Sequence, residues 1–200
     1  MNGNLLFKLL FQPSKVFNYL SHANSPAIAR ISRYSILVLL LPPIFSWLGG
    51  SHFGWRLGGS EPVFLDTTGS IVFGFFYIFI LCIGFIGTVY ISRWMATTYG
   101  AKVSQALHFS LFTVVCAPLV AASAAHLYPD VFFNVLILIP ALIWSITLLY
   151  KGLPVALGIS PERGMLMASA LVGWLLVAAV SLLGICVGLW INGAESILGV

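Results

Sequence analysis

Hydrophobic residues fall in long blocks along this chain, and charged residues fall between the blocks. A helix needs about 20 mostly apolar residues to cross a hydrocarbon core ~30 Å thick, so blocks of that length predict membrane spans. The blocks predict five transmembrane helices within a single membrane domain of residues 1–200, at about residues 34–50, 69–92, 105–126, 130–150 and 165–191. The expected fold class is therefore an all-α polytopic membrane protein.

Prolines and glycines mark the expected helix ends. Pro26, Pro129 and Pro161 stand ahead of the first, fourth and fifth spans, at positions typical of the first turn of a helix. Gly100 and Gly152 follow the second and fourth spans, where a left-handed C-cap is expected. These residues predict defined helix starts and two glycine-capped ends.

The stretch before the first span is amphipathic but too short to cross the membrane. Residues 1–24 carry clustered leucines and phenylalanines that are interrupted by Lys8, Pro13 and Lys15. This pattern predicts one or two short helices lying at the cytoplasmic interface. The alternative is a disordered tail with hydrophobic spots.

Composition excludes a soluble fold, because 60% of the residues are hydrophobic and only 7% are charged, against roughly 25% in an average soluble domain. The net charge of +4 comes from residues that flank the spans rather than forming a run. Lipid is therefore the expected partner, and nucleic acid is not.

Basic residues also predict the orientation. With the N-terminus inside, eight of the nine Lys and Arg residues are cytoplasmic and Arg56 alone is outside. The eight are Lys8, Lys15, Arg30, Arg33, Arg93, Lys102, Lys151 and Arg163. The positive-inside rule therefore predicts an N-in/C-out topology.

Residues for chemistry are scarce. The spans lack internal Asp, Glu, Lys and Arg, which disfavours ion-coupled transport. Ser51 and His52 are neighbours in sequence, but adjacency alone makes no catalytic dyad. No phosphate-binding, dinucleotide or zinc-protease motif occurs. We expect no catalytic residue, cofactor or metal. One alternative is an external metal cluster, made from His52, His126, Glu61, Asp66 and Asp130.

Prolines inside the spans are candidate helix kinks: Pro42, Pro43, Pro118 and Pro140. Each removes a backbone hydrogen bond, and in lipid the freed carbonyl needs another donor. The kinks serve either packing or a gating or binding role.

The chain resembles the Yip domain family, named for Ypt/Rab-interacting proteins, and in particular its compact bacterial inner-membrane branch. The resemblance rests on Gly54-Trp55, Pro118-Leu119, Leu127-Tyr128-Pro129, and residues 149–154 and 158–164. It implies five spans with a cytoplasmic N-terminus. Eukaryotic members are associated with prenylated Rab-type GTPases through a long soluble N-terminal region that this sequence does not show, so that partnership is not expected. The bacterial branch implies an inner-membrane protein without an established activity.

These observations predict a non-enzymatic, Yip-type binding or organising component of the bacterial inner membrane. A channel or transporter for a small solute is the alternative, and an enzyme ranks third. The expected partners are membrane lipids, a membrane or cytoplasmic protein, or a second copy of the chain. The loop between spans four and five is the expected recognition surface, with Tyr150, Lys151, Gly152, Pro154, Glu162 and Arg163 as its candidate residues.

Overall fold

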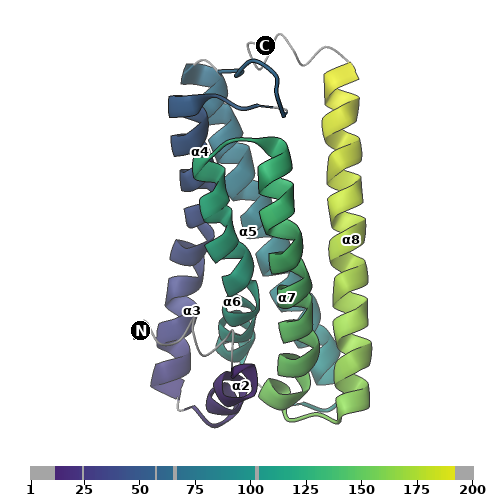
Figure 1. Ribbon diagram of the computed structural model, residues 1–200. Helices are drawn as coiled ribbons and strands as arrows, with labels where there is room; N and C mark the ends of the chain where they lie inside the picture. The colour runs from purple at the N-terminus through teal and green to yellow at the C-terminus, as the bar shows by residue number, and fades with distance from the viewer. Residues whose placement is uncertain (1–11, 24, 57, 65–66, 102–103, 192–200) are drawn as a thin grey trace.

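The structure, a computed structural model, describes residues 12–23, 25–56, 58–64, 67–101 and 104–191, with side chains up to residue 181. The described elements are α2 (Pro13–His22), α3 (Ser25–Leu39), α4 (Leu41–Phe53), α5 (Thr67–Thr98), α6 (Gln105–Ala122), the 3-10 helix η1 (Ser123–Leu127), α7 (Val131–Leu157) and α8 (Pro161–Ile191) (Figure 1). Among these residues, five helical stretches are long and apolar enough to cross a membrane: Ser25–Phe53, Thr67–Thr98, Gln105–Leu127, Val131–Leu157 and Pro161–Ser181. The predicted number of spans is confirmed.

The long helices form one upright bundle, and the short helix α2 lies across one end of it (Figure 1). We call this the α2 end, and we call the other, which carries residues 54–64, the opposite end. Of the nine Lys and Arg residues, seven are described, since Lys8 and Lys102 are not. Six lie at the α2 end and only Arg56 at the opposite end. The six are Lys15, Arg30, Arg33, Arg93, Lys151 and Arg163.

Two glycine caps differ in their outcome. Gly100 ends α5 at a φ of 82°, and the Ala101 amide donates to the Ala96 carbonyl at 2.9 Å, which confirms the expected cap. The predicted cap at Gly152 is wrong. Helix α7 continues through Gly152 and ends at Gly158, whose φ is 64°. An apolar stretch follows residue 152, and continuing the helix keeps its backbone groups bonded near lipid.

Helix α7 starts at Val131, two residues after the proline that was expected to begin it. Pro129 precedes the helix, and Asp130 is the N-cap, with its carboxylate accepting from the Phe133 amide at 2.8 Å. The aspartate side chain satisfies an amide that has no partner within the helix. At α8, by contrast, Pro161 occupies the first helical position as predicted.

The four predicted kink prolines fall into two groups. Pro42 and Pro43 follow a break in the first span, where α3 ends at Leu39 and α4 begins at Leu41. Neither proline has an amide hydrogen, so the helical ladder is interrupted there. Pro118 lies within α6 and Pro140 within α7, and both helices continue through them.

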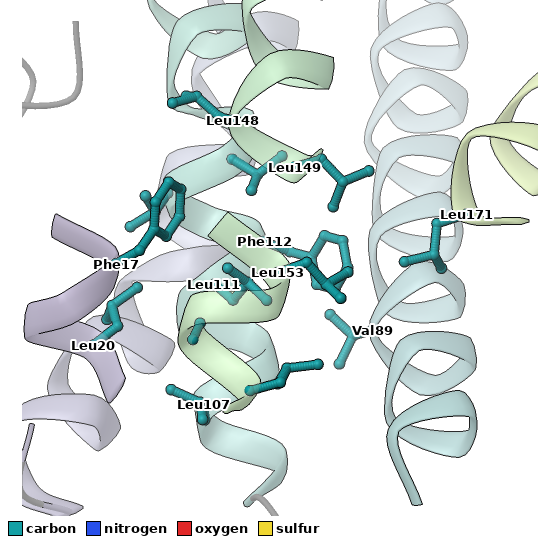
Figure 2. Packing of buried hydrophobic residues seen from close by; sticks show 14 of the residues in the cluster. Phe17, Leu20, Val89, Leu107, Leu111, Phe112, Leu148, Leu149, Leu153 and Leu171 are labelled. Carbon is teal, nitrogen blue, oxygen red and sulfur yellow. The ribbon is translucent and has the colours of Figure 1, made fainter. Parts of the chain in front are cut away.

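The apolar core is concentrated toward the α2 end. Figure 2 shows Phe17 and Leu20 of α2 directed at the side chains of α6 and α7, with Val89 and Leu171 on the far side. Phe17, Val89 and Leu171 are fully buried. Helix α6 is the most enclosed span, with 56% of its most apolar window buried against 11% for α5. Helix α6 is therefore the central element, and α5 leaves most of its surface uncovered by the other helices.

Candidate functional site

The predicted recognition residues lie on the last turns of α7 and the first turn of α8, not on an open loop. Tyr150 is half-buried, and its hydroxyl lies 2.8 Å from the Ser169 hydroxyl on α8. This hydrogen bond joins the two helices. Tyr150 therefore has a structural role, because its hydroxyl helps to hold α7 against α8.

Gly152 is the residue of α7 on which α2 packs. It is buried, and a Cβ atom at this position would lie 2.3 Å from the Phe17 ring. Only glycine lets that ring reach the α7 backbone. Val16, Phe17 and Leu20 are consequently buried against the other helices. Residues 1–11 of the predicted interfacial segment lie outside the described residues.

Pro154 and Gly164 make the second close contact. A Cβ atom on Gly164 would lie 2.5 Å from the Pro154 side chain, so the backbone of α8 at Gly164 packs directly on the proline ring of α7. The Pro154 carbonyl accepts from the Gly158 and Ile159 amides, which ends α7 in a glycine-dependent turn. The proline and the two glycines thus define the path of the chain between the helices.

Arg163 is bound to the end of a third helix. Its guanidinium donates to the Tyr99 carbonyl at 3.2 Å, just past the C-terminus of α5 at Thr98. A cation is favoured there because the last carbonyls of a helix carry partial negative charge. Lys151 and Glu162 are exposed and, within the described part of the chain, make no hydrogen bond or ion pair. These two charges are the groups at the turn that remain available to a partner.

A buried polar cluster at the opposite end was not predicted from the sequence. Asn134 donates its amide hydrogens to the carbonyls of Tyr128 and Asp130, at 2.9 and 2.7 Å. This fixes the Asn134 side chain, so its oxygen accepts from Nδ1 of His126. Nε2 of His126 is then the acceptor for the Tyr77 hydroxyl, at 3.2 Å. An asparagine one turn into an apolar span was the available signal.

The loop beside this cluster is compact. Trp55 and Val63 exchange two backbone hydrogen bonds of 2.8 Å, and the Arg56 backbone pairs with Pro129 and Val131. Trp55 lies against His126, with ring centroids 6.2 Å apart. The indole of Trp55 therefore packs in part against the buried polar cluster.

The histidine and serine candidates for chemistry are bound to backbone carbonyls. Nδ1 of His52 lies 2.9 Å from the Leu48 carbonyl, and the Ser51 hydroxyl lies 3.2 Å from the same nitrogen. A nitrogen that donates to a carbonyl cannot also accept the serine proton, so this pair is not arranged for nucleophilic catalysis. Among the described residues, no three His, Cys, Asp or Glu side chains are grouped to hold a metal. Asp66, one member of the alternative metal cluster, lies outside them.

Comparison with known proteins identifies the family of this chain. The Yip1 domain family model matches residues 7–191, and the chain belongs to this family. It is 25% identical over 183 residues to the inner membrane protein YohC of Escherichia coli K12, covering 91% of this chain and 93% of YohC. The YohC of E. coli O6:H1 (strain CFT073) matches to the same extent. No solved structure matches the chain.

Proposed function

We propose that this protein is a non-enzymatic component of a bacterial inner membrane that binds or organises other membrane constituents at its α2 end. Membership of the Yip1 family and the similarity to a protein named as an inner membrane protein support this location. The proposed topology is N-in/C-out, because six of the seven described basic residues lie at the α2 end. Labelling of introduced cysteines at Lys151 and Arg56 in intact cells tests it, with only the second position accessible from outside.

The observation that carries the binding role is the construction of the α7–α8 turn. Contacts of Tyr150, Gly152 and Gly164 hold the turn against α2 and the start of α8, and Arg163 ties it to α5. The exposed charges of Lys151 and Glu162 are thus presented on a rigid base. Such preorganisation lowers the entropic cost of binding a partner. The partner class is a membrane or cytoplasmic protein that presents an acidic group to Lys151 and a basic group to Glu162.

The test is site-specific crosslinking in cells, with a photoreactive residue placed at Lys151 or, as control, at Arg56. We expect a discrete protein adduct from position 151 only, and its loss in the Glu162→Gln background. The Glu162→Gln protein should keep its melting temperature, since Glu162 is exposed. Absence of an adduct, or an adduct that persists unchanged in the Glu162→Gln background, contradicts a recognition role for the turn. An adduct to a second copy of the chain would identify self-association as the form that binding takes.

A channel or transporter for a small solute is the second candidate, and buried polar atoms favour it. Within the described part of the chain, four buried polar atoms have no hydrogen-bond partner, namely Ser92 Oγ, His108 Nε2, Trp144 Nε1 and Ser145 Oγ. Such atoms are costly in a membrane interior. Against a pathway, Val89, Leu111, Leu148, Leu153 and Leu171 contribute fully buried apolar side chains from four helices. Solute flux into proteoliposomes that contain the full chain, compared with empty vesicles, separates transport from binding.

A further inference from the structure

Two arginines on α3 point away from the rest of the bundle. The opposite face of α3 is anchored to α6, because the Ser110 hydroxyl donates to the Ile28 carbonyl at 3.0 Å and the Ser35 hydroxyl is bonded to that of Thr113. At about 100° per residue, Arg30 and Arg33 lie far round the helix from Ile28 and Ser35. Both arginines are exposed, whereas Ser35 is buried.

These arginines line a hollow on the outer face of the helix. Its described lining is Pro26, Ala29, Arg30, Arg33, Tyr34 and Leu37, and its volume is about 520 Å³. Residues three and four apart are neighbours on a helix surface, so the two guanidinium groups and the Tyr34 hydroxyl project from one patch. The patch is polar toward the start of the span, and the exposed apolar residues Leu37, Leu41 and Ile44 follow it toward the membrane centre.

The charge of this patch is uncompensated within the described part of the chain. Neither Arg30 nor Arg33 has an ion pair or hydrogen bond there, whereas Arg93 donates to Gln105 and Arg163 to Tyr99. The described acidic residues Glu61 and Asp130 belong to the opposite end, and Glu162 belongs to the α7–α8 turn. A cation beside the hydrocarbon needs a counter-charge, which the protein does not supply here.

We propose that the Arg30–Arg33 patch is a binding site for an anionic glycerophospholipid of the inner leaflet. The lipid phosphate sits between the two guanidinium groups, whose planar forks match phosphate oxygens. Tyr34 lies at headgroup depth, and an acyl chain follows Leu37, Leu41 and Ile44. This site is on the opposite flank of the bundle from the α7–α8 turn (Figure 1), and it does not depend on the function proposed for that turn.

The experiment compares lipid binding by full-length protein in detergent, using native mass spectrometry with phosphatidylglycerol and phosphatidylcholine. We expect the wild type to prefer phosphatidylglycerol. The double variant R30Q/R33Q should lose about 30-fold in affinity for phosphatidylglycerol, since each basic residue near the membrane surface raises the binding constant about fivefold. The control Lys15→Gln removes a charge from the same end of the bundle and should retain the preference.

Two further arms keep the outcome decisive. R30K/R33K retains the charge without the bidentate fork, so its affinity should fall between wild type and R30Q/R33Q. Soluble glycerol phosphate should compete weakly, because it lacks acyl chains. Equal binding of both lipids by wild type, unchanged binding by R30Q/R33Q, or full displacement by glycerol phosphate would overturn the proposal. If R30Q/R33Q does not fold, the R30K/R33K variant, which keeps both charges, decides the question.

Discussion

The two ends of the bundle are held together by different interactions. At the α2 end, aromatic and aliphatic side chains pack directly on glycines, as Phe17 does on Gly152. At the opposite end, Asn134, His126 and Tyr77 form a chain of hydrogen bonds. In lipid, the hydrophobic effect contributes little to the association of helices. Association depends instead on close packing at small residues and on buried hydrogen bonds. This protein uses one solution at each end.

The comparison also shows where each end is vulnerable. The α2 end depends on space, so adding atoms should damage it more than removing charge. The opposite end depends on pairing, so removing one polar group leaves others unsatisfied. Gly49 adds one steric contact there, since a Cβ atom on it would lie 2.0 Å from the His126 carbonyl oxygen.

The largest effect is expected from Gly152→Leu. The added side chain would occupy the space of the Phe17 ring, so α2 must move away from α7 or α7 must bend. Overpacking of this kind costs about 1–3 kcal/mol, occasionally more. Thermal denaturation in detergent should show a lower melting temperature. Labelling of a cysteine introduced at Leu20, which is buried on the same helix, should be faster in the variant than in the parent.

Gly173→Leu is the matched control, because a Cβ atom at Gly173 has no atom within 4 Å. Its melting temperature should stay close to that of the parent. Equal stability of the Gly152 and Gly173 variants would show that the packing of α2 does not depend on the space at Gly152.

Asn134→Ala should have the next largest effect and should loosen the opposite end alone. The change leaves Nδ1 of the buried His126 without its partner, whereas the carbonyls of Tyr128 and Asp130 keep backbone amide donors. A buried unsatisfied group costs about 1–3 kcal/mol. Hydrogen exchange should rise in residues 123–134 but not in α2. Asn18→Ala, which alters an exposed asparagine on α2, is the control; increased exchange at both ends after Asn134→Ala would mean that the ends are not independent.

Arg163→Gln should have the smallest effect. The lost contact with the Tyr99 carbonyl is exposed, and a cation near a helix C-terminus contributes about 0.3–1 kcal/mol. Exchange of the amides in the last turn of α5 should increase slightly. Lys151→Gln should leave them unchanged, and equal changes in both variants would assign the effect to general charge loss.

Sequence reasoning singled out the residues around the α7–α8 turn but did not predict their contacts. The stretch from Tyr150 to Gly164 stood out because glycine, proline and charged residues are concentrated in it. Its pattern suggested a turn at Gly152 and Pro154, whereas the chain remains helical to Leu157. A glycine that ends a helix and a glycine that makes room for a neighbouring ring look the same in sequence. Here the ring belongs to Phe17, which lies 135 residues before Gly152 in the chain (152 − 17 = 135).

What the sequence determined by itself is the membrane class, the number of spans and the segregation of basic residues. These properties follow from block length and local charge, which the bilayer selects without any tertiary contact. Only the tertiary structure decided that Gly152 receives Phe17, that Arg163 binds the end of α5, and that Asn134 fixes His126. Those choices depend on which helix faces meet. In a chain whose spans are apolar on every side, hydrophobic periodicity carries too little information to orient the faces.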